Sequence, residues 1–349
     1  MRIYKEHLLL SSSNIREALL KLDMLAIDAI LFIVDESDKL LGSLTDGDIR
    51  RGLLKGVSIN DSVKIIIQLN PKFINKEKYD IKKIIDYRDN NFKILPVVDN
   101  NNIVVNVINF RLLRSYLPVD AIIMAGGRGS RLQPLTNTIP KPLLKIGDKA
   151  IMEHNVDRLA LYGIDDYWFS VNYLGEQIED FFGNGQDKNR FIHYVWEDKP
   201  LGTIGAVSNI KNLKHNYVLL TNSDVLTNLD YEQFYLDFIE NDADFSVVSI
   251  PYKVNIPYAV LEENKEGFVT NFREKPTYTY YSNGGIYLMK KSVLDYIPKN
   301  TFFNATDLMD KLICDKKKVI SYPFAGYWLD VGKHEDFNKA QEDLKKIKF

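Results

Sequence analysis

A glycine-rich segment followed by several cations is the part of this sequence best suited to chemistry. It comes directly after the strand-like run 120–124 and consists of Ala125, Gly126, Gly127, Arg128, Gly129 and Ser130. Three glycines let the backbone approach a ligand closely and direct successive N–H groups toward anionic oxygens. Arg131 and Lys141 add positive charge, and prolines on both sides of Lys141 stiffen its backbone. A tight turn alone would also need glycine, but with these cations the segment predicts a phosphate-binding site.

Asp224 is a candidate ligand for a metal ion, and a second aspartate lies in unusual surroundings. Asp224 follows the apolar run 217–220, and Asp330 lies between Trp328 and Gly332 in an otherwise apolar segment. An unpaired charge at Asp330 would be costly there. As a hard oxygen ligand, Asp224 could hold Mg²⁺ against phosphate oxygens. For Asp224 alone, a helix cap or a solvated turn is an equally ordinary explanation.

Composition excludes several other classes of function. The five histidines include no pair at the spacing of metal ligands, and neither a Gly-Lys-Ser/Thr phosphate loop nor a nucleophile elbow occurs. A net charge of −2 argues against nucleic acid or an anionic membrane as the main partner. The single cysteine, Cys314, excludes an internal disulfide framework, and the apolar runs are far shorter than the about 20 residues of a membrane span. We therefore expect a cytoplasmic protein with no nucleic-acid or membrane partner.

The first third of the chain contains an internal repeat. The strand–turn–strand pattern of residues 33–44 recurs 64 residues later as residues 97–108, and a helical pattern precedes each copy at 15–22 and 81–87. Each copy predicts a β-hairpin flanked by helices. The repeat resembles a tandem pair of CBS domains, small α+β modules that often bind adenine nucleotides and pair face to face. The resemblance covers residues 1–117 and implies a regulatory or dimerisation module, with a homo-oligomer formed through it.

In that family a Thr and an Asp after the second hairpin strand commonly hold the ribose of the nucleotide. Thr45 and Asp48 stand at these places in the first copy, whereas the second copy has Leu112 where Asp48 would be. The resemblance therefore implies one regulatory nucleotide site at most. The alternative is that Thr45 and Asp46 only cap the helix beginning near Ile49, and that the module is a dimerisation surface.

A new pattern begins after Leu117 and Pro118. Strand-like runs at 120–124, 167–171, 191–196, 217–220 and 244–250 alternate with helical runs at 152–161, 174–182, 204–211 and 231–239. This alternation predicts an α/β domain over residues 118–349, with a doubly wound, mostly parallel sheet. Ligands of such sheets bind at the carboxyl ends of the strands. A chain of 349 residues is consistent with two domains.

Residues 124–143 resemble the signature of the sugar nucleotidyltransferases, which join a nucleoside triphosphate to a sugar 1-phosphate. Further motifs of that family follow in its order at residues 197–206, 221–224, 272–276, 283–287 and 328–332. The resemblance covers residues 119–349 and implies a Rossmann-like nucleotidyltransferase fold of GT-A type, with a nucleoside triphosphate and a sugar 1-phosphate as substrates.

The resemblance also assigns roles to individual residues. Arg131 would hold the departing phosphates, Lys141 would neutralise charge at the reacting phosphates, and Asp224 would act in catalysis and share one Mg²⁺ with Asp330. Residues from Ala125 to Ser130, with Glu197 and Gly202, would bind the nucleotide. The sugar phosphate would be bound by Glu274, Lys275, Asn283 and Gly285.

The identity of the base depends on Glu197. Guanine presents two adjacent donors, which an ionised carboxylate can accept together, whereas uracil and thymine suit a glutamine amide better. GTP is therefore favoured, with a uridylyl- or thymidylyltransferase as the alternative. A CBS pair before this catalytic domain resembles the glucosamine-1-phosphate guanylyltransferases of legionaminic acid and other surface-glycan pathways, so glucosamine 1-phosphate is expected before mannose or heptose 1-phosphate. A catalytically silent, nucleotide-sensing regulatory protein is the alternative from another class.

Overall fold

The computed structural model describes residues 3–186 and 190–347. The chain divides into two compact units, which we describe separately. Unit 1 comprises Met1–Pro118, Ala160–Asp165 and Gly185–Phe191, and unit 2 comprises Val119–Leu159, Asp166–Asn184 and Ile192–Phe349. No helix among the described residues combines the length and the apolar character needed to cross a membrane.

Unit 1 contains the two copies of the repeat. The first has sheet order β1-β2-β3-β4, and the second has order β5-β6-β7. Its elements are β1 (Leu8–Leu10), α1 (Ile15–Leu25), β2 (Ile30–Val34), β3 (Leu40–Thr45), α2 (Asp46–Leu54), β4 (Gln68–Leu69), β5 (Ile74–Asn75), α3 (Ile81–Asp89), β6 (Ile94–Val98) and β7 (Val104–Asn109). Both predicted hairpins form, and each has the same irregularity, between Ile33 and Val34 and between Val97 and Val98.

The copies join by equivalent hydrogen bonds. The Leu40 amide donates to the Asn102 carbonyl at 2.9 Å, and the Val104 amide donates to the Asp38 carbonyl at 2.9 Å. The two donors are 64 residues apart in sequence, and so are the two acceptors. The hairpins are therefore related by an approximate two-fold axis. The second copy lacks a counterpart of α2 among the described residues, because the chain after β7 forms a turn and continues to β8.

Unit 2 is built on a seven-stranded sheet of order β12-β11-β8-β13-β18-β15-β19. Strand β8 pairs in parallel with β11 and β13, whereas β18 runs antiparallel to both β13 and β15. The strands of unit 2 are β8 (Val119–Met124), β9 (Lys145–Ile146), β10 (Lys149–Ala150), β11 (Asp166–Val171), β12 (Phe191–Trp196), β13 (Tyr217–Asn222), β14 (Val225–Thr227), β15 (Phe245–Asn255), β16 (Val260–Glu263), β17 (Val269–Arg273), β18 (Thr277–Lys290), β19 (Val319–Pro323) and β20 (Trp328–Asp330).

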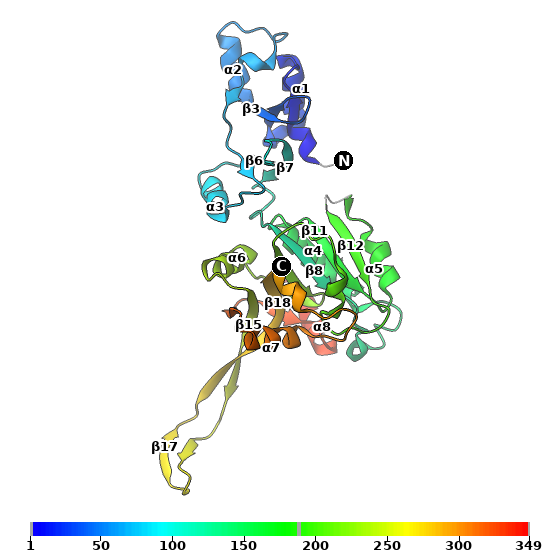
Figure 1. Cartoon of the computed structure of the whole chain (residues 1–349), viewed down its shortest axis with the longest axis vertical. Coiled ribbons are helices and arrows are strands. Elements are labelled where there is room, and N and C mark those ends of the chain that lie inside the picture. The colour runs from blue at the N-terminus through cyan, green and yellow to red at the C-terminus, as the bar shows by residue number, and fades with distance from the viewer. Residues whose placement is uncertain (1–2, 187–189, 348–349) are drawn as a thin grey trace. The chain divides into compact units, whose positions relative to one another are not determined.

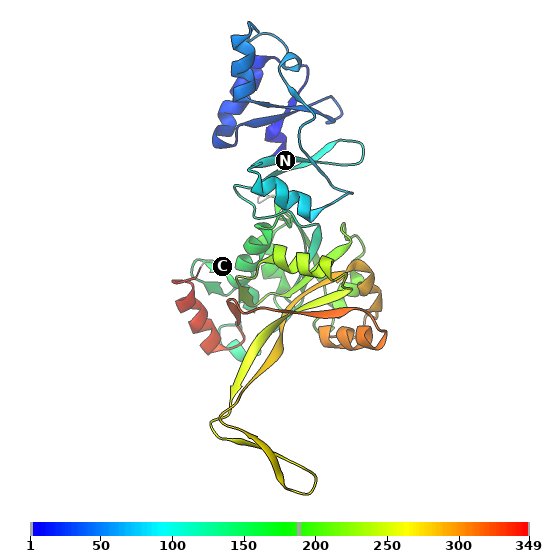
Figure 2. The ribbon, with the colours of Figure 1, turned by 90° about the vertical axis from the view of Figure 1, so that its left-hand side faces the viewer.

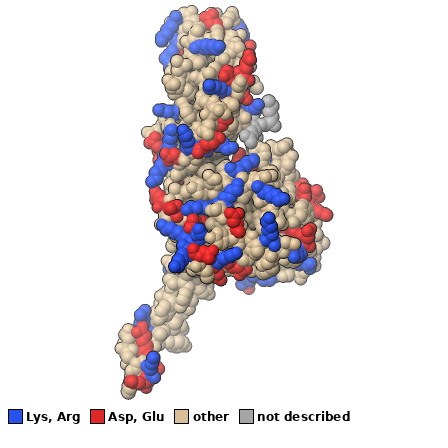
Figure 3. Space-filling model, in the orientation of Figure 1, with Lys and Arg blue, Asp and Glu red and all other residues tan. Residues whose placement is uncertain are grey.

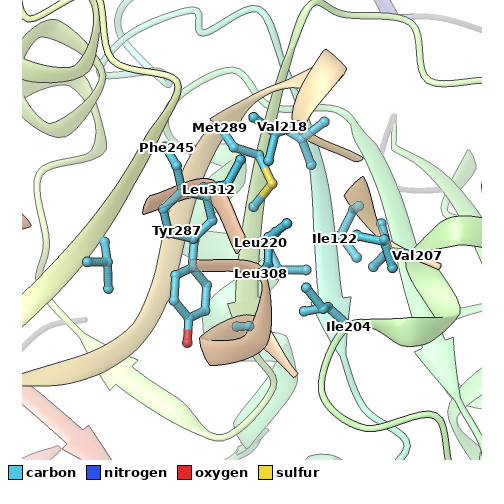
Figure 4. Packing of buried hydrophobic residues seen from close by; sticks show 14 of the residues in the cluster. Ile122, Ile204, Val207, Val218, Leu220, Phe245, Tyr287, Met289, Leu308 and Leu312 are labelled. Carbon is cyan, nitrogen blue, oxygen red and sulfur yellow. The ribbon is translucent and has the colours of Figure 1, made fainter. Parts of the chain in front are cut away.

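Helices cover both faces of this sheet, as a doubly wound fold requires. They are α4 (Ile151–Ala160), α5 (Gly175–Phe182), α6 (Tyr231–Glu240), α7 (Ala305–Cys314) and α8 (His334–Asp343). Figure 4 shows one face, where Leu308 and Leu312 of α7 pack against Val218 and Leu220 of β13. On the other face, the ring of Tyr217 contacts Phe238 of α6 edge-on.

The prediction of an α-helix at residues 204–211 is wrong. Residues 204–211 contain only a short 3-10 helix, η7 (Gly205–Asn209). The Ile204 amide donates to the Phe303 carbonyl, and a Cβ on Gly205 would lie 2.5 Å from the Thr301 carbonyl oxygen. Close packing against residues 301–303 therefore prevails over the local helical pattern.

Strands β15 and β18 continue beyond the sheet as a two-stranded ribbon, and the short hairpin of β16 and β17 lies at its end (Figures 1 and 2). We call residues 250–282 the arm. Its shaft is residues 250–255 with 277–282, and its tip is residues 256–276.

Candidate active site

The carboxyl ends of three neighbouring strands meet at one edge of the sheet in unit 2. Ser170 of β11 lies opposite Met124 of β8, which in turn lies opposite Asn222 of β13. Adjacent strands are about 4.8 Å apart. The glycine-rich loop after Met124 therefore starts between the residues that follow β11 and those that follow β13, where ligands of such sheets bind.

The glycine-rich loop is tightly confined at two of its glycines. Gly129 has φ 62°, and a Cβ there would lie 3.0 Å from Lys141 Cβ and from Thr136 Cγ2. A Cβ on Gly126 would lie 3.2 Å from Oε1 of Glu197, whereas one on Gly127 would meet nothing within 4 Å. Gly127 thus leaves open space over the loop, while Gly126 and Gly129 allow Glu197 and Lys141 to approach it.

Lys141 and the two predicted aspartates form one cluster. The Lys141 ammonium donates to Oδ2 of Asp224 and lies 3.9 Å from Oδ1 of Asp330. Asp224 follows β13, and Asp330 ends β20, which pairs with β14 so that Asp330 lies opposite Val225. The Asp224 carbonyl accepts from the Val331 amide at 3.0 Å, which ties the two loops together. Residues about 190 positions apart in sequence are thus brought to a single point.

The two carboxylates have unmet capacity to bind a cation. Oδ1 of Asp224 and Oδ1 of Asp330 are buried without a hydrogen-bond partner. Burial, and then the neighbouring charge of Asp224, raise the pKa of Asp330, while Lys141 and Arg131 act in the opposite sense. Carboxylate oxygens without a hydrogen bond on two neighbouring aspartates fit a divalent cation with oxygen ligands. The donor set therefore suits a divalent cation, the class of ion that the sequence predicts.

A second set of possible metal ligands lies at the opposite edge of the same sheet, where the strands begin. Asp120, Asp166 and His215 come close together there. Both oxygens of Asp120 accept hydrogen bonds from backbone amides, those of Lys214 and His215, and the Lys214 ammonium pairs with Asp166. This cluster is away from the glycine-rich loop, and its acidic groups already have partners.

The two arginines of the loop lie in different places. The Arg131 guanidinium is 3.4 Å from the position of a Cβ on Gly332, so Gly332 makes room for it beside Asp330. Arg128 instead lies over the ring of Tyr173, 5.7 Å from its centroid. The Tyr173 hydroxyl donates to the carbonyls of Thr136 and Asn137. Arg131 therefore faces the cluster of Lys141 and the aspartates, and Arg128 lines the exposed side of the loop.

Glu197 is held rigidly by its neighbours. Its Oε1 accepts from the Ser170 hydroxyl at 2.6 Å, and its Oε2 accepts from the Leu201 amide at 3.1 Å. Asn172 donates to its carbonyl at 2.6 Å. Gly202, with φ 78°, follows in the same loop and packs against the Phe303 carbonyl. The carboxylate is thus oriented toward Gly126, with lone pairs remaining on both oxygens.

Sequence reasoning missed three residues that position this site. Ser170 and Asn172 orient Glu197, and Asn155 of α4 donates to the Ser223 carbonyl at 3.0 Å, next to Asp224. The sequence signal that could have identified them is their polar character at the end of the apolar run 167–171 and inside the helical run 152–161. Their partners are 25 or more residues away in sequence, so no local pattern identifies them.

The four predicted sugar-phosphate residues are not all brought to this edge. Gly285, with φ 70°, packs against Asn222, and the Gly284 carbonyl accepts from the Trp328 indole at 2.8 Å. Asn283 lies next to them and accepts from the Gly285 amide. Glu274 and Lys275, however, are exposed residues in the tip of the arm, and neither side chain forms a hydrogen bond or an ion pair within residues 3–186 and 190–347.

In unit 1, Asp48 is surrounded by donors. Its Oδ2 accepts from the Thr45 amide and hydroxyl, and its Oδ1 accepts from Gln68 and from Arg51. Thr45 in return caps α2 by accepting from the Asp48 amide. A carboxylate offers about four acceptor positions. All of them are in use, so a ribose would have to displace Gln68 or Arg51.

A cavity of about 300 Å³ lies elsewhere in unit 1, between the two copies of the repeat. Leu40, Leu41 and Asn102 line it together with residues 70–73 and with Lys83 and Tyr87 of α3. Two lysines, Lys72 and Lys83, and two aromatic rings, Phe73 and Tyr87, therefore face one space. Cations beside aromatic rings suit a ligand that is both anionic and aromatic.

Comparison with known proteins shows the family of the chain. The pattern of the family described as nucleotidyl transferase matches residues 120–347. The chain belongs to that family. The pattern of the CBS domain matches residues 9–55, within the first copy of the repeat.

Curated relatives of the catalytic unit use more than one base and sugar. A mannose-1-phosphate guanylyltransferase of Mycobacterium tuberculosis is 32% identical over 65% of this chain, and the chain covers only 64% of that relative. A D-glycero-alpha-D-manno-heptose 1-phosphate guanylyltransferase of Aneurinibacillus thermoaerophilus is 30% identical over 65% of this chain and 98% of its own length. A UTP–glucose-1-phosphate uridylyltransferase of Synechocystis is 30% identical over 63% of this chain.

Solved structures share the fold. HddC from Yersinia pseudotuberculosis, crystallised with GMP-PN, matches 65% of this chain and 99% of its own with a TM-score of 0.51 and 25% identity. A Bacillus anthracis protein described as a glucose-1-phosphate thymidylyltransferase matches 66% of this chain and 97% of its own with a TM-score of 0.53. At 24% identity, the second likeness concerns the fold alone.

Proposed function

We propose that this chain is a sugar-1-phosphate guanylyltransferase, which transfers GMP from GTP to a sugar 1-phosphate and releases pyrophosphate. The observation that carries the proposal is the position of Lys141 between Asp224 and Asp330, with Arg131 beside them, at the sheet edge where the glycine-rich loop begins. Cations and carboxylates in this arrangement suit a reaction between two phosphate groups.

In the proposed reaction, an oxygen of the sugar phosphate attacks the α-phosphorus of GTP, and the bond from that phosphorus to the departing pyrophosphate breaks. Backbone N–H groups of residues 125–130 bind the triphosphate, and Arg131 holds the departing phosphates. Lys141 stabilises the charge that develops on the reacting phosphate. Transfers of this kind depend mainly on positioning and electrostatic stabilisation, so no covalent enzyme intermediate is required.

Asp224 and Asp330 are the proposed ligands of Mg²⁺, in agreement with their unpartnered oxygens. When bound, the ion would polarise phosphate oxygens and align the two substrates. Asn283 and Gly285 are proposed to bind the sugar, and Glu274 and Lys275 its hydroxyls and phosphate.

The preference for GTP rests on Glu197. Its carboxylate is fixed near Gly126 by Ser170 and the Leu201 amide, and it keeps lone pairs for the two donors of guanine. Guanylyltransferases among the relatives support this reading, and the uridylyltransferase relative keeps UTP as the alternative. Glucosamine 1-phosphate, for surface-glycan or nonulosonate synthesis, remains the sugar substrate that we propose first. Because relatives are named for mannose and heptose 1-phosphates, these are the next substrates to test.

The decisive experiment measures pyrophosphate release for GTP, ATP, CTP, UTP and dTTP against glucosamine, mannose, heptose and glucose 1-phosphates, with and without EDTA. We expect turnover with GTP, and its loss on chelation with recovery on adding Mg²⁺. A preference for UTP or dTTP would replace the guanylyl assignment. No turnover with any pair would favour the silent, nucleotide-sensing protein.

A second candidate function concerns unit 1. We propose that it binds a regulatory nucleotide, and that the cavity lined by Lys72, Phe73, Lys83 and Tyr87 is a better place for it than Thr45 and Asp48. The lysines would pair with phosphate and the partly exposed ring of Phe73 would contact the base, whereas the acceptors of Asp48 are filled. Homo-oligomer formation through the CBS pair remains the alternative use of this unit.

A further inference from the structure

The arm extends away from the sheet of unit 2 without pairing to any other strand. Strand β15 pairs with β19 only as far as Ser249, and β13 pairs with β18 only from Ile286 onward. Between these limits β15 and β18 pair with each other alone, from Ser249 opposite Asn283 to Asn255 opposite Thr277. Figures 1 and 2 show this ribbon from two directions. Within the described residues, the hydrogen bonds recorded for arm side chains all lead to other arm residues.

Large aromatic side chains cover the arm and face solvent. Tyr252, Tyr280 and Tyr281 of the shaft and Tyr258, Phe268 and Phe272 of the tip are 59–75% exposed. Tyr252 lies opposite Tyr280, and Val254 lies opposite Tyr278, so these four side chains share one face of the shaft. Tyr281 lies opposite Pro251 and therefore on the other face, so the roughly 700 Å² of exposed ring surface is divided between the two faces of the shaft and the tip. Each partner in a standard protein interface contributes about 800 Å².

The shaft has the composition of an interface core. Lys253 is its only charged residue, and Figure 3 shows the charged side chains of the arm gathered at the tip. Interface cores are depleted in charge and enriched in tyrosine and phenylalanine. A two-stranded ribbon is marginally stable by itself in water, and its open edges are templates for pairing with another strand. A second copy of this chain offers both an identical open edge and an identical aromatic face, which a two-fold axis can bring together.

The position of Glu274 and Lys275 adds an independent reason. At about 3.3 Å per residue, the six steps from Ser249 to Asn255 carry the ribbon about 20 Å from the sheet. Both residues lie beyond that point, in the tip. Asn283 and Gly285 remain at the root of the arm beside Asn222. The active site of one chain therefore lacks two of its four proposed sugar-phosphate residues.

We propose that two copies of this chain exchange arms, so that the tip of each arm supplies Glu274 and Lys275 to the active site of the other copy. The aromatic faces of the shafts are buried in the same dimer. The roles of Glu274 and Lys275 rest on the proposed function; the burial of the shaft does not.

Mixed dimers test the exchange. One chain carries Asp224→Asn and a normal arm, and the other carries Lys275→Ala and a normal body; two different tags allow the heterodimer to be purified after co-expression. Each variant alone should be nearly inactive. The heterodimer should recover about half of the wild-type turnover, because one of its two sites is then whole. No recovery, or near-normal turnover of Lys275→Ala alone, would overturn the exchange.

A matched control combines two defects of the body. A heterodimer of Asp224→Asn with Lys141→Ala should stay inactive, since neither of its sites is whole whichever arm reaches it. Recovery there would show that complementation does not need an intact body combined with an intact arm from the other chain, and it would overturn the exchange.

The molar mass of the full chain tests the dimer without any assay of turnover. Tyr252→Ser with Tyr280→Ser should halve the mass measured by light scattering, whereas Ile313→Ser, which removes an exposed apolar side chain from α7, should leave it unchanged. An unchanged mass for the tyrosine variant overturns the proposal even if GTP turnover is observed. If the tyrosine variant has half the mass but the wild-type protein shows no turnover, the proposed function is refuted and the dimer formed through the arms is supported.

Discussion

Lys141 is the residue on which the proposed chemistry depends most directly. It is buried, although lysines rarely are, and both of its ionic neighbours are carboxylates with an unpartnered oxygen. A charge held in place before the reaction does not need to be reorganised in the transition state, which is why such groups accelerate phosphoryl transfer. The prolines at 140 and 142 and the contact of Gly129 with its Cβ fix this position.

Lys141→Ala and Asp224→Asn should each lower kcat by roughly 10²–10³, the effect expected for removing one preorganised electrostatic partner. Turnover of GTP measures this, and circular dichroism checks that the variants fold. Lys145→Ala removes an exposed lysine of β9 and should have little effect. Near-normal turnover by folded Lys141→Ala would place the active site elsewhere.

Glu197→Gln should reduce kcat/KM for GTP about 5- to 150-fold more than for UTP, because the amide offers a donor where guanine needs an acceptor. The GTP/UTP ratio is the quantity to measure. Glu176→Gln, an exposed change on α5, is the control. If the ratio is unaltered, Glu197 does not recognise the base and only orders the loop through Ser170 and Leu201.

At the scale of elements, helix α2 shows how one side chain can serve structure where the sequence suggests ligand binding. Burial raises the pKa of Asp48, but the hydrogen bonds from Thr45, Gln68 and Arg51 outweigh it and hold the pKa below its usual value. The same bonds start α2 and fasten it to Gln68, next to β3. Asp48 therefore stabilises the first copy in its ionised form.

A carboxyl whose pKa is lower in the folded than in the unfolded protein stabilises the fold at any pH above its pKa in the unfolded protein, which is about 3.9. This stabilisation is lost as the pH falls through the pKa of the carboxyl in the folded protein. We therefore expect hydrogen exchange of the α2 amides, corrected for intrinsic rates, to accelerate in wild type below about pH 4. Asp48→Asn should already exchange fast at pH 7, with a weaker dependence on acid. Asp46→Asn, exposed in the same turn, should behave like wild type. Slow exchange in Asp48→Asn at pH 7 would refute this role.

At the scale of the whole molecule, the chain contains two units with separate candidate nucleotide sites. In unit 2 the candidate site is a sheet edge, and in unit 1 it is a cavity between the two copies of the repeat. The hydrogen bond between Leu40 and Asn102, two residues that line this cavity, joins the two copies of the repeat there. A nucleotide bound there would contact both copies at once, so its binding would be coupled to their arrangement.

Calorimetry of the full chain with AMP and GMP tests the site in unit 1. Lys72→Ala with Lys83→Ala should weaken binding there by a factor of ten or more, since charge-assisted bonds to phosphate are worth about 1.5–3 kcal/mol. Asp48→Asn should retain binding, and Lys64→Ala, an exposed change in the same unit, serves as control. Loss of binding in Asp48→Asn but not in the lysine variant would return the site to Thr45 and Asp48.

The sequence alone determined much of this protein, because many of its signals are local. The 64-residue repeat, the alternation of strands and helices and the glycine-rich loop each lie in consecutive residues. The hairpins at 30–45 and 94–109 and the sheet of unit 2 follow from these patterns. The short motifs likewise identified the family. Lys141, Asp224 and Asp330 were found in the sequence for the same reason, each within its own segment.

Only the tertiary structure decided which of these segments meet. Parallel pairing of β11, β8 and β13 aligns Ser170 with Asn222, and the β14–β20 pair brings Asp330 to Asp224. Packing on residues 301–303 replaced a helix after Ile204 with a 3-10 turn. Continued pairing of β15 with β18 carried Glu274 and Lys275 away from Asn283, although they are close in sequence. Each outcome depends on hydrogen bonds and contacts between distant residues, whose energies no local pattern contains.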